Sequence, residues 1–322
     1  MHLPRRGGSS MPDARWQRLE SGVRQVWCCP KCESELHLIS IDRPTSDCKC
    51  QVCGFQIVRY SGFLCFAPEL IDRAEGFDPA LFEMLARIEE TNFWFVNRAR
   101  LIVALLQRYF PAARNILEIG CGTGSVLLAL RRAMPKLRLA GSELNPRGLQ
   151  IARKRLGDVL LVQMDARRIP ARSEFDVIGV FDVIEHINDD DAVLEQMHAA
   201  LKPGGGLIVT VPQHRWLWSK TDDAAHHMRR YERGEMERKL DQTASGFRIL
   251  RSTSYTSLLL PVMILSRLLR RGRSEADPFA ELQVSGWLNR ALSSVLWLEI
   301  GLTRSGLNWP IGGSRVIVAQ RL

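Results

Sequence analysis

Features that would place this chain of 322 residues in a membrane or outside the cell are missing from it. No stretch reaches the roughly 20 uninterrupted apolar residues that cross a bilayer, and no apolar signal-peptide core follows the basic start. Both absences predict a cytoplasmic protein, with peripheral membrane contact left open. Hydrophobic residues make up 46% of the chain, which excludes global disorder. The net charge of +9 suits nucleic acid or an acidic lipid surface, and does not decide between them.

Most of the eight cysteines lie between residues 28 and 53, which in a reducing compartment indicates metal binding rather than disulfides. Two CxxC pairs stand 17 residues apart, and they are Cys29 with Cys32 and Cys50 with Cys53. Two such pairs are typical of a tetrahedral Zn²⁺ site, which would supply much of the folding free energy of so small a module. Cys28 and Cys48 lie beside the pairs as alternative ligands, and reduced cysteines without metal are the competing interpretation.

The same segment contains CCPKC, then CQVCG, and finally GFLCFAPE. This pattern resembles the small zinc-ribbon domains that accompany bacterial and eukaryotic methyltransferases. The resemblance implies a structural zinc ion and a structural or substrate-presenting role for the ribbon, not a catalytic one.

A glycine-rich turn follows the first strongly apolar strand, which we predict over 115–119. Gly120, Gly122 and Gly124 form a GxGxG pattern, and a helix is predicted over 125–134. Glycines at such a place let the backbone approach a ligand at a helix N-terminus, where N–H groups are free. Glu118 stands two residues before the first glycine, a different arrangement from the GxGxxG of dinucleotide sites.

Further apolar strands and turns follow in an order typical of a doubly wound α/β sheet. The strands are predicted over 138–144, 159–165, 175–182, 207–211, 248–255 and 314–320. The predicted fold is α/β, a Rossmann-like doubly wound sheet of seven strands, with a small zinc ribbon in front and a helical insertion before the last strand.

The ordered set of motifs resembles the class I S-adenosylmethionine-dependent methyltransferases. In that family the acid before the glycines anchors the methionine amino group, the acid ending the second strand binds the ribose, and the acid ending the third contacts the adenine. The resemblance implies a cofactor site formed by Glu118, Gly120, Cys121, Gly122, Gly124, Glu143, Leu144, Asp165, Ala166 and Asp182.

Asp182, Glu185 and His186 follow the fourth strand, beside the expected position of the methyl group, and are the candidate catalytic residues. Their DxxEH pattern resembles the ExxEH divalent-metal motif of certain O-methyltransferases. A metal would need one more ligand, from His214, His226 or His227. Many relatives with DVxEH bind no metal, and in them the acid and histidine support the cofactor or the loop. His186 as a general base is preferred to the metal.

Arg229 and Arg230 end a polar and aromatic segment that begins at Pro212. The segment resembles that of a bacterial methyltransferase subgroup associated with cell-envelope or glycan pathways. The two arginines either bind a phosphate or carboxylate of the acceptor or pair with nearby acids such as Asp222.

The insertion contains two apolar blocks, over 258–265 and 284–302, and a cluster of arginines from residue 267 to 273. These blocks could lie on an anionic membrane, close over an apolar acceptor, form a dimer interface or pack on the core. Long aliphatic runs suit RNA less well than basic residues interleaved with aromatics. The insertion therefore favours a lipid-linked or otherwise amphipathic acceptor over nucleic acid.

The predicted organisation is a flexible arm (1–24), a zinc ribbon (25–70), a helical cap (71–112), the methyltransferase domain (113–255), the apolar insertion (256–311) and the final strand (312–322). The predicted function is methyl transfer from S-adenosylmethionine, as O-methylation of a small or lipid-linked acceptor of cell-envelope type. The alternatives are an RNA methyltransferase that uses the ribbon to bind RNA, and a non-catalytic assembly module.

Overall fold

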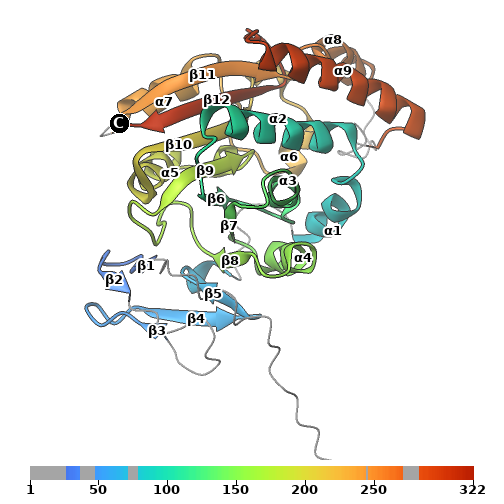
Figure 1. Cartoon of the computed structure of the whole chain (residues 1–322). Coiled ribbons are helices and arrows are strands. Elements are labelled where there is room, and N and C mark those ends of the chain that lie inside the picture. The colour runs from blue at the N-terminus through green and yellow to red at the C-terminus, as the bar shows by residue number, and fades with distance from the viewer. Residues whose placement is uncertain (1–26, 37–47, 72–78, 244–245, 271–282) are drawn as a thin grey trace, which may run out of the picture.

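The computed structural model describes residues 27–36, 48–71, 79–243, 246–270 and 283–322 (Figure 1). The predicted arm over 1–24 lies outside these ranges, as do parts of the ribbon and of the insertion. The strands are β1 Trp27–Cys28, β2 Glu35–Leu36, β3 Cys48–Lys49, β4 Gln56–Tyr60, β5 Phe63–Cys65, β6 Asn115–Ile119, β7 Arg138–Glu143, β8 Leu160–Gln163, β9 Phe175–Phe181, β10 Leu201–Pro212, β11 Phe247–Tyr255 and β12 Ser314–Arg321. The α-helices are α1 Pro79–Ile88, α2 Phe93–Tyr109, α3 Ser125–Ala133, α4 Pro146–Leu156, α5 Asp190–Ala200, α6 Lys220–Ala224, α7 Glu235–Gln242, α8 Leu260–Arg270 and α9 Gly286–Arg304. Short 3₁₀ turns, η2 Pro68–Leu70, η3 Ile184–His186 and η4 Arg215–Leu217, complete the elements.

The central sheet has the strand order β11-β12-β10-β9-β6-β7-β8-β5-β4-β3. Strands β8, β7, β6, β9 and β10 are parallel, and β12 is antiparallel to both β10 and β11. The parallel strands are largely apolar and buried because both faces of the sheet are covered, and every residue of β6 is buried. The predicted α/β fold class is therefore confirmed.

Helices cover both faces of the sheet, as a doubly wound fold requires. On one face, α2, α3 and α9 pack on the strands through a cluster that includes Leu106, Leu130 and Ile300. On the other face, α5 and α7 contribute Met197 and Leu240 to a second buried cluster. The carboxyl ends of the parallel strands are thereby held at one edge, where ligand sites of such sheets form.

The ribbon strands continue the central sheet. Strand β5 pairs in parallel with β8, and β4 and β3 extend the sheet beyond it (Figure 1). The carboxamide of Gln163 donates to the Ala67 carbonyl at 2.8 Å and accepts from the Ala67 N–H at 3.1 Å. Trp27 also stacks on Phe66. The ribbon and the larger domain therefore share one buried core, which the cysteine spacing did not predict.

The apolar insertion forms α8 and α9, and α9 lies along α2 (Figure 1). The buried carboxylate of Glu299 on α9 accepts hydrogen bonds from the backbone N–H groups of Ser257 and Leu258, just before α8 begins. It therefore satisfies N–H groups that have no helical acceptor. Among the described residues, no helix is both long and apolar enough to cross a bilayer.

Candidate active site

The glycine turn joins β6 to α3 in a backbone conformation that favours glycine. Gly120, Gly122 and Gly124 have φ angles of +66°, +52° and +78°. A Cβ atom on Gly120 would lie 2.4 Å from a methyl carbon of Val183, in the segment that follows β9. Glycine is therefore required at position 120 by conformation and by space.

A cavity of about 1170 Å³ opens at this edge of the sheet. Its first half is lined by the glycine turn and by the ends of β6, β7 and β8, and its second half by α8 and α9. All the residues predicted to hold the cofactor line it except Gly124, which is the N-cap residue of α3. The predicted catalytic residues Asp182, Glu185 and His186 also line this cavity.

The acids at the strand ends differ in their hydrogen-bond and ion-pair partners. Glu118 is buried, one of its oxygens has no hydrogen-bond partner in the described structure, and burial raises its pKa to about 8. Glu143 accepts from the N–H groups of Gly122 and Asn145, both at 3.1 Å, and burial raises its pKa as well. Asp165 is held by the guanidinium of Arg167 at 3.0 Å. Glu118 thus offers the cavity a buried carboxyl oxygen that has no hydrogen-bond partner among the described residues.

Asp182 is bound by two side chains from other elements. Arg98 on α2 forms an ion pair with its carboxylate, and Thr210 donates to it at 3.0 Å. Asp182 also has a φ of +56°, an uncommon conformation for a residue with a side chain. The guanidinium of Arg98 lies 4.6 Å from the ring centroid of Trp94, so α2 fixes the position of this ion pair. Sequence reasoning missed Arg98 because nothing local marks its partner 84 residues away.

Glu185, His186 and His227 form a cluster whose ligand atoms lie within 4.8 Å of one another. Neither carboxylate oxygen of Glu185 has a hydrogen-bond partner among the described residues, and burial raises its pKa well above the usual value. Burial, together with the neighbouring His227, lowers the pKa of His186 to about 4. The two imidazole rings meet edge to face, 4.8 Å apart.

Asp222 fixes the orientation of the His227 ring. Its carboxylate bonds to Nδ1 of His227 at 2.9 Å and to the buried guanidinium of Arg230 at 2.7 and 3.0 Å. Burial alone would raise the pKa of Asp222, but the hydrogen bonds and charges of His227 and Arg230 hold it well below its usual range. Of the three histidines considered as an extra ligand, the structure brings His227 into the cluster, leaving its Nε2 3.8 Å from Glu185.

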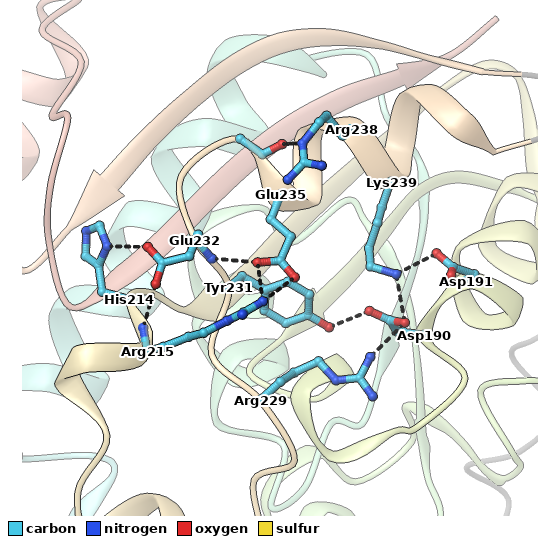
Figure 2. A network of polar contacts seen from close by, with 11 residues as sticks. Asp190, Asp191, His214, Arg215, Arg229, Tyr231, Glu232, Glu235, Arg238 and Lys239 are labelled. Atoms are coloured by element: carbon cyan, nitrogen blue, oxygen red, sulfur yellow. Dashed lines mark hydrogen bonds and ion pairs between the residues drawn. The ribbon is translucent and has the colours of Figure 1, made fainter.

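The arginines after β10 are held by acids of the chain. Arg230 pairs with Asp222. Arg229 pairs with Asp190 at 2.9 Å (Figure 2). Asp190 also accepts from Tyr231 and from Lys239, so the start of α5 is joined to α7 (Figure 2). Of the two roles predicted for these arginines, the structure supports pairing with acids.

His214 is occupied elsewhere in this network. Its Nδ1 lies 3.1 Å from Glu232, whose other oxygen accepts from the backbone N–H of Arg215 at 2.9 Å (Figure 2). Glu232 in turn donates its own N–H to Glu235 at 2.9 Å. The network therefore holds the loop after β10 in place. His214 contacts Glu232 and is not part of the cluster around Glu185.

The four cysteines of the two CxxC pairs come together in the ribbon. The Sγ atoms of Cys29 and Cys53 are 3.5 Å apart, and those of Cys32 and Cys50 are 3.6 Å apart. Four thiolates around Zn²⁺ at about 2.3 Å would be separated by roughly 3.8 Å, so the donor set and spacing fit a tetrahedral ion. Cys28 is not part of the cluster, and the side chain of Cys48 is outside the described structure.

Comparison with known proteins shows the same class as the fold and the glycine turn. The model of a methyltransferase-domain family matches residues 94–252. The chain is 29% identical over 192 residues to the trans-aconitate 2-methyltransferase of Acidovorax ebreus, covering 58% of this chain and 67% of that protein. It is 33% identical over 145 residues to the demethylmenaquinone methyltransferase of Thermotoga maritima, covering 44% and 60%.

A solved structure has the same fold. It is the S-adenosylmethionine complex of phosphoethanolamine N-methyltransferase 2 from Haemonchus contortus, with a TM-score of 0.51 and 19% identity, covering 79% of this chain and 59% of that one. The fold and the motif order define a Rossmann-like methyltransferase. Residues 94–252 therefore form a methyltransferase domain, and the S-adenosylmethionine-dependent methyltransferase class that the sequence predicted is confirmed. Its matches span 59% to 67% of the length of these three proteins.

Proposed function

We propose that this chain transfers the methyl group of S-adenosylmethionine to a hydroxyl oxygen of a small or lipid-linked amphipathic acceptor. The observation that carries the proposal is the continuous cavity from the glycine turn to the apolar helices α8 and α9. The relatives named above act on small molecules, which supports a small acceptor. We expect the protein to work in the cytoplasm, where thiols remain reduced and free to bind zinc.

The strand ends are proposed to hold the cofactor, which supplies an electrophilic methyl group when bound. Glu118 fits its cationic amino group because a buried carboxylate oxygen there has no other partner. Glu143 fits the ribose hydroxyls, and Asp165 with Ala166 fits the adenine. Gly120, Cys121, Gly122 and Leu144 form the walls around them. The Asp182–Arg98 ion pair lies next to this site. We assign it the role of holding the segment after β9 in place, not a role in proton transfer.

The apolar half of the cavity is proposed to receive the acceptor. Leu259 just before α8, Met263 of α8, and Leu288 and Leu292 of α9 line it, and Arg267 lies at the same wall. Such a surface fits a hydrocarbon or isoprenoid portion better than a base or a sugar. An RNA acceptor would instead require stacking surfaces and free cations, whereas Arg230 in this cavity is already paired with Asp222.

The cluster of Glu185, His186 and His227 is proposed to activate the acceptor hydroxyl. In the simplest arrangement, His186 or His227 accepts the hydroxyl proton as the oxygen attacks the methyl carbon and the carbon–sulfur bond breaks. Because Asp222 bonds to Nδ1 of His227, Nε2 is the nitrogen of that ring that would take a proton, and it lies 3.8 Å from Glu185. His186→Ala and His227→Asn should each abolish turnover while leaving cofactor affinity nearly unchanged.

A divalent cation in the same cluster is the second candidate, favoured because neither carboxyl oxygen of Glu185 has a hydrogen-bond partner among the described residues. One carboxylate and two imidazoles suit a first-row cation, and a histidine backed by a carboxylate is a common metal ligand. Dialysis against a chelator, followed by addition of Mn²⁺ or Zn²⁺, distinguishes the two arrangements. Loss of turnover while the cysteine cluster keeps its zinc, with recovery on addition of Mn²⁺, would support the cation, and an unaffected rate would support the histidine base.

The experiment that tests the function is calorimetric titration with S-adenosylmethionine and, in parallel, with NAD. Binding of the sulfonium alone, lost in Glu143→Ala, is the expected result. Incubation with labelled cofactor and a lipid extract should then transfer label to an organic-soluble product. A folded, zinc-loaded protein that binds no S-adenosylmethionine would contradict the proposal and leave the non-catalytic assembly module. Salt-sensitive RNA binding with label on RNA would establish the RNA alternative.

A further inference from the structure

Helix α9 has an apolar side that no other part of the described structure covers. Its inner side packs on α2 through residues such as Leu296 and Ile300. Its outer side, here the α9 outer face, consists of Trp287, Arg290, Ala291, Ser294, Trp297, Leu298, Gly301 and Leu302, all exposed. Trp287 is 68% exposed and Trp297 is 65% exposed.

The spacing of these residues places them on one stripe. They recur every three or four positions along the helix, the period of one helical face. A surface helix of a globular domain normally shows polar residues on that side and apolar residues only toward the core. Two large exposed tryptophans therefore indicate a partner surface rather than the ordinary scatter of apolar side chains.

Helix α8 adds a second exposed stripe beside the cavity. Leu265, Leu268 and Leu269 are 57%, 52% and 70% exposed. Val262 is 53% exposed and also lines the cavity, so the cavity can be reached along α8. Helices α8 and α9 both lie at the end of the molecule opposite β3 and the ribbon (Figure 1).

The charges around these stripes are of one sign. In the described part of the insertion, 256–270 and 283–311, the acidic residue is Glu299, which is 1% exposed. Arg290 and Arg304 are exposed, and neither forms an ion pair with a described residue. In this described part of α8 and α9, the exposed charges are therefore cationic, and the one carboxylate is buried.

From this combination we infer that the α9 outer face docks on an anionic membrane surface. Tryptophan is suited to the boundary between headgroups and acyl chains, and arginine is attracted by anionic headgroups. A symmetric contact between two copies of the α9 outer face would place arginines on both sides, and the described residues of this face include no carboxylate to pair with them. The charge pattern therefore favours lipid over self-association.

The consequence for catalysis rests on the proposed function. With α9 on the bilayer, the exposed stripe of α8 would lead from the lipid surface into the cavity at Val262. A lipid-linked acceptor could then enter without its hydrocarbon portion crossing water. The surface thus supports the lipid-linked class over a freely soluble acceptor.

The test is flotation of the full-length protein with vesicles of phosphatidylcholine alone or of phosphatidylcholine mixed with phosphatidylglycerol. We expect flotation with the mixed vesicles only, weaker as salt increases, with a blue shift of tryptophan fluorescence. Trp287→Ala/Trp297→Ala should abolish flotation, and Arg290→Glu/Arg304→Glu should lower vesicle affinity by about fivefold or more per arginine. Tyr60→Ala, which removes an exposed aromatic side chain from the ribbon, is the matched control and should float normally.

Calorimetric S-adenosylmethionine binding by each variant separates this inference from the proposed function. Normal cofactor binding with no flotation of the unmodified protein would overturn the docking inference alone. A protein that elutes as a dimer, and becomes a monomer in Trp287→Ala/Trp297→Ala, would assign the surface to a second copy and also overturn it. Flotation without cofactor binding would uphold docking while contradicting the proposed function.

Discussion

The buried carboxyl of Glu118 gives cofactor binding a pH dependence that can be measured. Burial raises its pKa to about 8, the nearby acids Glu89 and Glu143 add to the effect, and Arg98 opposes it. With that pKa, roughly nine tenths of the molecules carry a proton on Glu118 at pH 7. A cationic amino group bound by this carboxyl requires the ionised form. Binding at pH 7 should therefore release close to one proton.

The size of the effect follows from the same pKa. Between pH 6 and pH 7, the ionised fraction of Glu118 rises about tenfold, and the association constant should rise equally, or by ~1.4 kcal/mol. In this window the α-amino group of the cofactor stays mostly protonated, since such groups titrate near pH 8. The rise should level off once the pH passes about 8.

The raised pKa also affects the cofactor-free protein. Because the folded state holds a proton on Glu118 that the unfolded chain has lost, this group contributes stability below the ordinary value of 4.5. That contribution declines as the pH rises from about 4.5 through 8. Cofactor binding and folding should therefore respond to pH in opposite directions.

The assay is titration calorimetry at pH 7 in two buffers that differ in ionisation enthalpy. The difference in apparent binding enthalpy gives the number of protons released. Glu118→Gln keeps the shape of the side chain but cannot ionise, so its binding should be weaker and release no proton from this site. Equal proton release by the unmodified protein and by Glu118→Gln would refute the assignment of Glu118 to the amino group.

Gly120→Ala places a methyl group against Val183, so it should abolish cofactor binding and cost about 1–3 kcal/mol, checked by calorimetry and thermal unfolding. Cys50→Ser removes one of four clustered thiolates, and elemental analysis should show zinc content falling well below one ion per chain; retention of a full equivalent would contradict the ligand set. Gln163→Leu leaves two ribbon backbone groups without their partner and should lower the free energy of unfolding by about 1–3 kcal/mol in urea titrations. Glu299→Ala removes the acceptor for two N–H groups before α8, so hydrogen exchange there should accelerate while β6 exchange is unchanged.

The sequence was informative where structure depends on local pattern. Parallel strands buried on both faces are continuous apolar runs, so β6 and β9 could be located from the sequence and ordered from the turns between them. The glycine turn was recognisable because its positive φ angles require glycine. The cysteine pairs were recognisable because metal ligands have fixed spacing.

The remaining features depend on contacts between distant elements. The pairing of Asp182 with Arg98 joins the end of β9 to α2, and periodicity does not encode such a partner. His227 was considered only as one of three histidines, because its orientation by Asp222 depends on how the loop after β10 folds back. The pairing of β5 with β8 depends likewise on where the edge of the larger domain's sheet lies, and the cysteine spacing does not reveal that edge.

The pairing of β5 with β8 also has a consequence for how the protein can be divided. A parallel sheet without its outermost partner presents a row of free N–H and carbonyl groups, and such a row invites pairing between separate molecules. In this chain the ribbon seals that row, through backbone pairing at Leu64 and Cys65 and through the side chain of Gln163. Removing the ribbon should therefore give an aggregation-prone fragment instead of a smaller working enzyme. The ribbon thus covers an edge of the sheet and also carries the candidate metal site.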